Sequence, residues 1–338
     1  MRKMLRDGHD RLPAAAELAH SRPDLESWPI SLDAGALRLR SGDLSRRETM
    51  VLRAFFMLPA ALREQIFFRV RPWSMPLQVL LNRCRGGAHS VRVLFAAGPL
   101  AQFQFRAVTG EKYFLLGPAY ERQNWRIFQS LIRPGDVAYD IGAHAGFWAL
   151  GLAGLVGARG RVVAIEPSPQ NFMRLRENVL LNCGPRRGGA ATLAASFGVD
   201  ASSPGGIILL NVALGDRAGW IDLVEAGTRT HLAAPSAGRA ESGSGAPVQV
   251  PMVRLDDLVF KQRQPPPSFL LLDVEGAAGR VLAGAARVLS RFRPGVICEI
   301  HDAAECAQAA AALARHHYRF TRIGRGARTP VHYLAQPV

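Results

Sequence analysis

Cysteine is scarce in this sequence, and its four copies are isolated. Cys84, Cys183, Cys298 and Cys306 form no C-x-x-C pair and show no zinc-finger spacing. Isolated cysteines of this kind are typical of small buried side chains in a reduced protein, and not of a disulfide scaffold. The chain also lacks a secretory signal behind its basic start and an apolar run long enough to cross a bilayer. We therefore expect a cytoplasmic protein without a transmembrane segment.

Lysine is almost absent too, with three copies among 42 basic residues, although the formal net charge is +15. An arginine bias in a chain so rich in Ala and Gly fits the coding bias of a GC-rich genome as well as an anionic partner. The excess is concentrated in residues 1–133, which hold 21 Lys and Arg against 11 Asp and Glu. No arginine run alternates with aromatic residues, so we expect no nucleic-acid partner.

The sequence pattern changes near Arg133, from a basic and weakly periodic segment to alternating predicted strands and helices. Residues 1–110 are basic and weakly periodic, and we expect them to form a partly flexible accessory segment, with helical spacing in Glu48–Phe68 and a strand in Val91–Phe105. A further short strand is expected at Tyr113–Leu116. Two stretches rich in Gly, Ala, Ser and Pro, Gly184–Gly206 and Ala233–Ala246, are expected to be surface insertions.

Strands and helices alternate in residues 111–338, which we expect to form one α/β domain. The predicted strands are Val137–Ile141, Val162–Ile165, Ile207–Val212, Phe269–Leu272 and Val296–Ile300. The predicted helices are Ala145–Leu155, one that Ser168 caps with Pro169 at its first position, Val281–Leu289 and Ala303–Leu313. This order predicts a mainly parallel sheet covered by helices on both faces.

Acids and glycines mark a ligand site at the ends of the first two of these strands. Asp140 closes the first strand, the loop after it carries Gly142 and Gly146, and Glu166 follows the second strand. Gly residues allow a tight backbone beside a ligand, and an acid after the second strand suits ribose hydroxyls. A dinucleotide site would need G-x-G-x-x-G, whose middle glycine is missing. The pattern favours a cationic ligand without phosphates, such as S-adenosylmethionine.

Several blocks of the chain resemble the FkbM family of O-methyltransferases. The blocks are Gly135–Phe147, Ala164–Phe172 with Leu175, Asn178 and Asn182, Asn211–Asp216, Val253–Asp256, Leu272–Gly276 with Val281–Gly284, and Glu299–His301. The resemblance implies a Rossmann-like methyltransferase fold with a seven-stranded sheet, and S-adenosylmethionine as cofactor. It also implies methyl transfer to a hydroxyl of a small molecule, sugar, or glycolipid- or polyketide-type acceptor. The expected cofactor contacts are Asp140, Gly142, Ala143, His144, Gly146, Phe147, Glu166, Pro167, Asn171, Ala213 and Asp273.

The chain departs from the family pattern at two positions. Leu271 stands where the family usually has Lys, two residues before its Asp. Ala278 stands where the family usually has Glu, two residues after its Gly. Both changes leave room for an altered substrate or reduced activity.

Three acids and a histidine form the expected reacting end. Asp273 and Glu275 follow the fourth predicted strand, and Glu299 and His301 end the fifth. A carboxylate or imidazole there can orient an acceptor hydroxyl and take its proton. Two other roles stay open: Asp273–Gly276 as a helix cap, and His301 as a polar residue at a strand end. The ligand spacing is not compact, so we expect no metal site.

Two other functions remain open alternatives at this point. The positive charge would suit a nucleic-acid methyltransferase, although the sequence has neither an Asn/Asp-Pro-Pro-aromatic motif nor a Pro-Cys nucleophile. The changes at Leu271 and Ala278 would suit a catalytically degenerate protein that only binds S-adenosylmethionine. The sequence does not specify the acceptor or the oligomeric state.

Overall fold

The computed structural model describes only part of the chain, and most of the described residues lie in 111–338. The described residues are 30–32, 37–39, 43–59, 62–63, 90–95, 100–101, 103–108, 122–182, 206–226, 229–232, 247–323 and 331–338. The expected strand Tyr113–Leu116 and the expected insertion Ala233–Ala246 lie outside these residues. The same holds for Gly184–Gly206 apart from its last residue.

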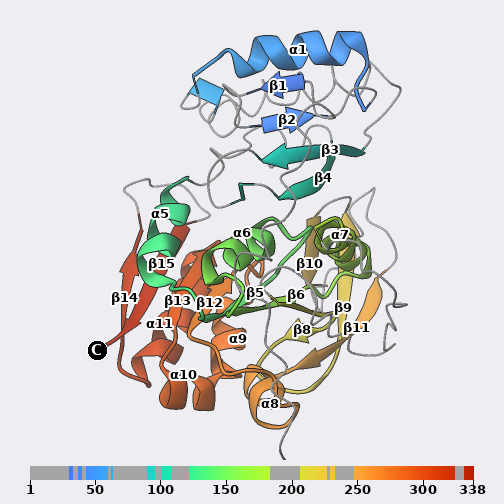
Figure 1. Cartoon of the computed structure of the whole chain (residues 1–338). Helices are drawn as coiled ribbons and strands as arrows, with labels where there is room; N and C mark the ends of the chain where they lie inside the picture. The colour runs from blue at the N-terminus through green and yellow to red at the C-terminus, as the bar shows by residue number, and fades with distance from the viewer. Residues whose placement is uncertain are drawn as a thin grey trace, which may run out of the picture.

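A seven-stranded sheet forms the centre of the molecule, with the strand order β14-β15-β13-β12-β5-β6-β7 (Figure 1). Its strands are β5 (Val137–Ile141), β6 (Arg161–Ile165), β7 (Ile207–Leu210), β12 (Phe269–Leu272), β13 (Gly295–Ile300), β14 (Tyr318–Arg322) and β15 (Val331–Pro337). Strands β7, β6, β5, β12 and β13 run parallel, whereas β15 is antiparallel to both of its neighbours. The mainly parallel sheet is confirmed. The chain reverses its direction of travel across the sheet between β5 and β12, and ligands bind at such switch points.

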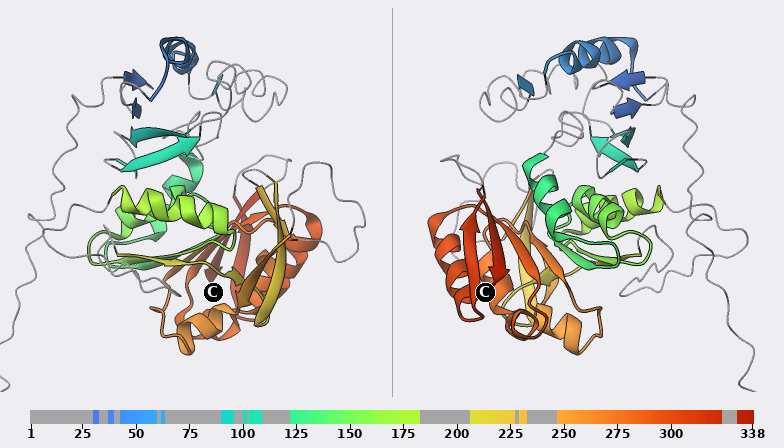
Figure 2. Two further views of the ribbon diagram at one scale, coloured as in Figure 1. Left: turned by 90° about the vertical axis from the view of Figure 1, so that its right-hand side faces the viewer. Right: turned by 60° about the vertical axis from the view of Figure 1, so that its left-hand side comes forward.

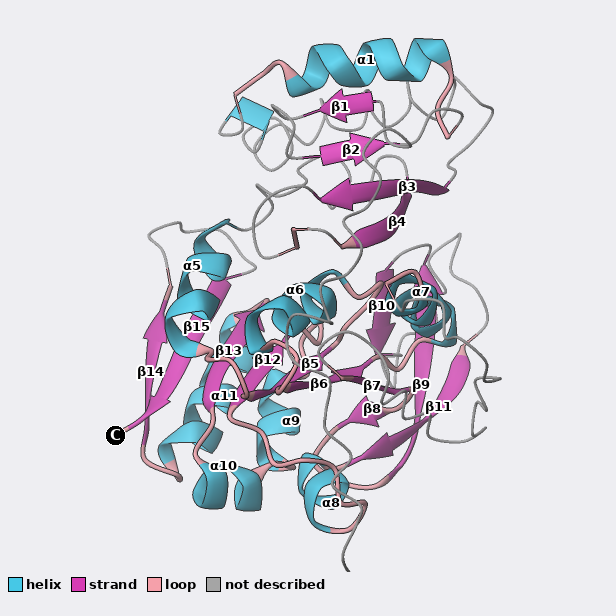
Figure 3. Ribbon diagram, viewed as in Figure 1, coloured by secondary structure: helices cyan, strands magenta, loops and turns pink. Residues whose placement is uncertain are grey.

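Helices cover both faces of the sheet, as Figure 3 shows. One face packs against α5 (Arg122–Leu131), α6 (Phe147–Val156) and α7 (Pro169–Leu180). The other packs against α8 (Leu255–Phe260), α9 (Ala278–Ala283), α10 (Ala286–Phe292) and α11 (Ala303–Ala314). Side chains alternate between the two faces along each strand, so the two layers have separate apolar cores. Among the described residues, no helix is both long and apolar enough to cross a membrane.

The predicted helix Val281–Leu289 is wrong in one respect, because it is broken into α9 and α10. The break is at Gly284, whose backbone passes so close to another loop that a Cβ there would lie 2.0 Å from the Gly215 carbonyl oxygen. The cap of α7 is confirmed, since the Ser168 hydroxyl accepts a hydrogen bond from the Asn171 N–H and Pro169 follows it.

A second sheet fills the connection between β7 and α8. It comprises β8 (Ala213–Leu214), β9 (Gly219–Ala226), β10 (Arg229–Leu232) and β11 (Val248–Val253), in the order β10-β9-β11-β8. Its small core includes Leu223, Val250 and Met252. The sheet lies on the side of β7 in the view of Figure 3.

The N-terminal elements form a third sheet, which lies over α6 and α7 (Figures 1 and 2). Its strands β1 (Ile30–Leu32), β2 (Leu37–Leu39), β3 (Ser90–Phe95) and β4 (Gln104–Val108) are hydrogen-bonded in chain order. Helix α1 (Arg46–Phe56) begins with a capping box in which Ser45 and Glu48 bind each other's backbone N–H. Such a reciprocal cap satisfies two of the unpaired donors at a helix start.

Two asparagines join this sheet to the methyltransferase-like half. The Asn182 side chain accepts from the Gln104 N–H and donates to the Gln104 carbonyl, both at 2.8 Å. One turn earlier, Asn178 accepts from the Arg106 N–H at 2.6 Å. Phe147 of α6 then packs its ring 6.1 Å from that of Phe105, measured between ring centroids. The two parts therefore share one apolar core, and the boundary near residue 110 stays a prediction.

Candidate active site

The loop after β5 is shaped by two glycines in the left-handed region. Gly142 has φ +91°, and a Cβ there would lie 1.9 Å from the backbone oxygen of Asp273. Gly146 has φ +89°, and a Cβ there would lie 2.7 Å from the Leu175 side chain. Gly is the residue that adopts both conformations without a steric cost. These glycines thus let the end of β12 and helix α7 approach the loop, which is a packing reason for them.

Glu166, at the end of β6, holds the same loop in place. Its carboxylate accepts hydrogen bonds from the backbone N–H groups of His144 (2.8 Å) and Ser168 (2.9 Å). The Asn211 side chain donates to the carbonyl oxygens of Glu166 and Pro167, at 2.8 and 3.0 Å. The acid after the second strand therefore lies beside the glycine loop, and its contact with a nucleoside stays a prediction.

Asp140 is wholly buried beneath this loop. Within the described part of the chain, neither of its carboxylate oxygens has a hydrogen-bond partner of good geometry. Burial raises the pKa of Asp140 well above its ordinary value, and the Asp273 and Glu166 carboxylates raise it further, while the Ala149 N–H has a weaker opposing effect. The charged form of a buried carboxyl without a partner is disfavoured in this way.

Leu271 explains why Asp140 has no cationic neighbour on the next strand. The two residues are paired in the parallel register of β5 and β12, and Leu271 belongs to the apolar core of the face that α6 covers. Residues paired in this way lie side by side on one face of a sheet. The family Lys expected at position 271 would therefore lie beside Asp140, and this chain has an apolar side chain in its place.

The remaining expected cofactor residues surround the loop with different exposures. Ala143 and Phe147 are buried, and the Phe147 ring is part of an aromatic cluster with Phe95 and Trp125, so it offers a cofactor only its backbone. Asn171 and Ala213 are buried as well, whereas Pro167 is partly exposed.

The reacting-end acids lie where β12 ends. The Asp273 N–H donates to the Ile141 carbonyl oxygen at 2.9 Å, which ties the end of β12 to the last residue of β5. Glu275 follows with φ +43°, an uncommon conformation for a non-glycine residue. Helix α9 has Ala277 as its N-cap residue, without a side-chain hydrogen bond. Asp273 and Glu275 therefore precede that helix and do not serve as its N-cap.

His301 brings carboxylates from three elements together. Its Nε2 lies 3.2 Å from a Glu275 oxygen and 3.4 Å from a Glu299 oxygen, and its Nδ1 lies 3.5 Å from a Glu305 oxygen. These carboxylates raise the pKa of His301 to about 10, with hydrogen bonding to Glu299 as the largest cause. An imidazolium among carboxylates is favoured for this reason.

Two members of this cluster were missed by the sequence reasoning. Glu305, in the first turn of α11, accepts the N–H groups of His301 (2.8 Å) and Ala278 (3.0 Å). His332 of β15 lies opposite Glu299 in the strand register, with its Nε2 3.2 Å from a Glu299 oxygen. The Asp302-x-x-Glu305 spacing of a helix start could have drawn attention to Glu305. No local pattern marks His332, since only the strand pairing brings it here.

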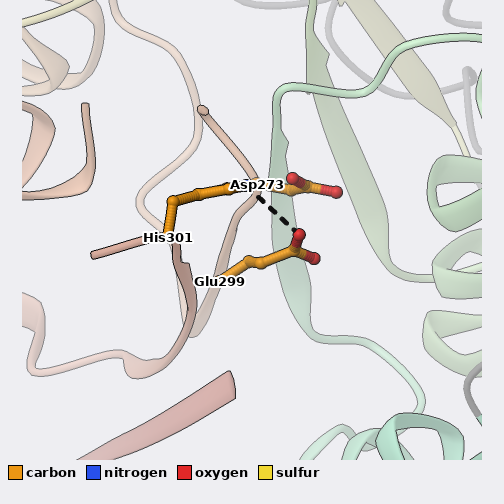
Figure 4. A group of neighbouring side chains, drawn as sticks. All are labelled: Asp273, Glu299 and His301. Carbon is orange, nitrogen blue, oxygen red and sulfur yellow. Dashed lines mark ion pairs between the residues drawn. The ribbon is translucent and has the colours of Figure 1, made fainter. Parts of the chain in front are cut away.

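Asp273, Glu299 and His301 converge at the ends of β12 and β13 (Figure 4). One potential ligand atom from each lies within 4.8 Å of the other two. The sequence separation of these residues had argued against a metal site, but the parallel strands β12 and β13 end at the same edge and close that separation.

Comparison with known proteins now places the chain in a family. The family model described as the methyltransferase FkbM domain matches residues 140–320, which is more than half of the chain. The chain belongs to the FkbM methyltransferase family. It is a methyltransferase, and the predicted family, fold class and enzyme class are confirmed.

Individual relatives and solved structures share at most 28% of their residues with this chain in the examples that follow. The 31-O-demethyl-FK506 methyltransferase FkbM of Streptomyces tacrolimicus is 28% identical over 227 residues, which cover 62% of this chain and 82% of the relative. The crystal structure of methyltransferase FkbM from Methylobacillus flagellatus is 16% identical with a TM-score of 0.39; the match covers 67% of this chain and 55% of that one. Aeropyrum pernix fibrillarin, solved with S-adenosyl-L-methionine, is 12% identical with a TM-score of 0.37, covering 62% and 68%.

Proposed function

We propose that this FkbM methyltransferase transfers a methyl group from S-adenosylmethionine to a hydroxyl of a small molecule, sugar, or glycolipid- or polyketide-type acceptor. The observation that carries the proposal is the position of Asp273. Its backbone bond to Ile141 holds the carboxylate next to the glycine loop, at the switch point of the sheet. The S. tacrolimicus relative, whose name describes an O-methylation, supports a hydroxyl as the acceptor.

The residues around the glycine loop fit S-adenosylmethionine. Two backbone donors orient the Glu166 carboxylate, which can accept further bonds from ribose hydroxyls because a carboxylate has about four acceptor sites. Asp140 is a buried carboxyl without a hydrogen-bond partner of good geometry in the described residues, so a nearby ligand ammonium would stabilise its charge. The remaining expected contacts lie in the glycine loop (Gly142 to Gly146, with Phe147 after it), in the turn and helix after β6 (Pro167 and Asn171) and in β8 (Ala213). When bound, the cofactor supplies an electrophilic methyl group on a sulfonium.

Asp273 then orients the acceptor hydroxyl and takes up its proton. The cofactor, which Asp140 and Glu166 would hold, would supply the methyl group: the hydroxyl oxygen would bond to the methyl carbon while the carbon–sulfur bond breaks and its electron pair stays on sulfur. Alignment of the oxygen with that bond supplies much of the rate in such a displacement. Glu275, Glu299 and His301 support Asp273 by fixing the turn and the strand end around it.

A methyl-transfer assay with a panel of hydroxylated acceptors tests the proposal. General base catalysis contributes about 10²–10⁴-fold, so Asp273→Asn should lower turnover by that factor. Cofactor affinity should change much less, because Asp273 is only one of several expected cofactor contacts. Asp216→Asn, an exposed acid outside the cluster, is the matched control and should keep its activity.

Two results would contradict this function. Retention of most activity by Asp273→Asn on a genuine acceptor would remove Asp273 from the reaction. Methylation of RNA or DNA, with binding that weakens steeply as salt rises, would make the chain a nucleic-acid methyltransferase instead.

A further inference from the structure

We propose that Asp273, Glu299 and His301 form a binding site for one divalent cation of the Mn²⁺ type. Two ligands of a single ion, each about 2.0–2.3 Å from it, are separated by no more than about 4–5 Å. The three potential ligand atoms here all lie within 4.8 Å of one another. Small side-chain adjustments are therefore enough to place one ion between them.

The donor set indicates which ions would bind. Carboxylates suit Mg²⁺, Ca²⁺ and Mn²⁺, whereas imidazole suits transition metals, and Mn²⁺ is the transition metal among the carboxylate-preferring ions. Glu299 is buried, whereas Asp273 and His301 are only partly buried, so the group is not closed off from solvent. A cation held by three protein ligands would keep open coordination positions.

Neighbouring side chains outside the three proposed ligands also orient two of them, His301 and Glu299. The buried Glu305 carboxylate is fixed by two backbone N–H groups and lies 3.5 Å from His301 Nδ1, while Nε2 of the same ring faces the cluster. On the other side, His332 Nε2 lies 3.2 Å from Glu299 Oε2, while Glu299 Oε1 faces His301. Metal-bound histidines and carboxylates are characteristically oriented by an outer carboxylate or imidazole, and Glu305 and His332 occupy these positions as ion-pair partners.

The charges of the cluster also favour a cation. Glu275, Glu299 and Glu305 each have a carboxylate oxygen within 3.5 Å of a His301 ring nitrogen. A carboxylate oxygen of Asp273 lies within 4.8 Å of His301 and Glu299 ligand atoms. The two imidazoles of the cluster, those of His301 and His332, do not neutralise four carboxylates even when both carry a proton, and uncompensated charge is costly where burial is high. A divalent ion bound to neutral His301 would displace the imidazolium proton and supply more positive charge than that proton at the point where the carboxylates converge.

Binding of the cation does not depend on the acceptor, but its role rests on the proposed function. A hydroxyl oxygen bound to a divalent ion has a lower pKa and a fixed position. One oxygen of Asp273 would bind the ion, and the other would receive the hydroxyl proton. The cation would thus position and acidify the acceptor hydroxyl, while Asp273 would remain the base that takes its proton.

Calorimetric titration of the full chain with MnCl₂, in the absence of S-adenosylmethionine and acceptor, tests the site. We expect one Mn²⁺ per chain. Glu299→Gln should lower the affinity by more than about tenfold, and the outer variant His332→Gln by about 10–100-fold. Glu177→Gln, an exposed acid on α7, is the matched control and should bind as the unaltered protein does. Melting temperatures measured with and without Mn²⁺ give a second readout that also reports whether each variant is folded.

Several results would overturn the proposal. The first is that the protein does not bind Mn²⁺ one-to-one at millimolar concentration. The second is an unchanged Mn²⁺ affinity in both Glu299→Gln and Asp273→Asn. If Glu299→Gln does not fold, Asp273→Asn decides the question alone. Methyl transfer that proceeds equally with Mn²⁺ and with a chelator would refute the cation's role while leaving the proposed O-methylation intact.

Discussion

Asp140→Asn removes the charge of the buried carboxyl beneath the glycine loop while preserving its size. The wild-type side chain is 0% exposed, and neither oxygen has a hydrogen-bond partner of good geometry among the described residues. A buried polar group left without partners costs about 1–3 kcal/mol, and more if it is charged. The Asn variant keeps a buried polar group and loses only the charge, so we expect it to be more stable than the wild type at neutral pH by the additional cost of the charge, on the order of 1 kcal/mol.

The gain should depend on pH in a defined direction. The pKa of Asp140 is raised in the folded state by burial and by the Asp273 and Glu166 carboxylates. The folded protein therefore binds this proton more tightly than the unfolded chain does. Its stability from this group is fully present below the unfolded pKa of about 4 and is lost as pH rises towards the raised folded pKa. The advantage of Asp140→Asn should accordingly grow from acid to neutral pH.

Urea unfolding of both proteins between pH 5 and 8 measures this difference in the free energy of unfolding. Thermal unfolding gives a second readout, in which each kcal/mol should change the melting temperature by about 2–4 °C for a domain of about 200 residues. Asp216→Asn, an exposed acid, is the control and should show no trend. The same variant should bind S-adenosylmethionine more weakly, because the ammonium loses its carboxylate. A destabilised Asn variant, or a gain that shrinks as pH rises, would refute the reasoning.

Two further substitutions test the packing around the site. Gly142→Ala combines a strained φ with a collision against the Asp273 backbone and should lower the free energy of unfolding by about 2–6 kcal/mol. Gly135→Ala is the control, because Gly135 has a similar φ but open space around it, and it should lower the free energy of unfolding by only about 1–3 kcal/mol. Denaturant unfolding measures both values. Equal costs would disprove the close approach. Asn182→Ala leaves both backbone groups of Gln104 without their side-chain partner and should cost about 1–3 kcal/mol, with faster hydrogen exchange at Gln104; unchanged exchange there would contradict the joint between β4 and α7.

The parallel strands and the glycine loop could be predicted because their signals are local. Val137–Ile141 and Phe269–Leu272 are short apolar runs with the bounds that the structure gives them, and Asp140 and Glu166 follow from where such strands end. The β8–β11 sheet was missed because its strands carry polar residues and the stretch beside them, Ala233–Ala246, suggested only a loop.

The reacting end was only half predictable from sequence. The Asp273 and His301 positions follow from strand ends, but their meeting with Glu305 and His332 depends on tertiary pairing. The break at Gly284 is likewise invisible locally, because the contact that requires glycine comes from Gly215. Contacts between distant segments, and not local propensity, decide these features.

Calorimetric titration of the full chain with S-adenosylmethionine, and with its demethylated product, tests the central claim most directly. The account predicts one site of micromolar affinity for both ligands, with strong weakening in Glu166→Gln and little change in the exposed control Glu177→Gln. No heat with either ligand, or unchanged binding by Glu166→Gln in a folded protein, would contradict the cofactor site at the ends of β5 and β6.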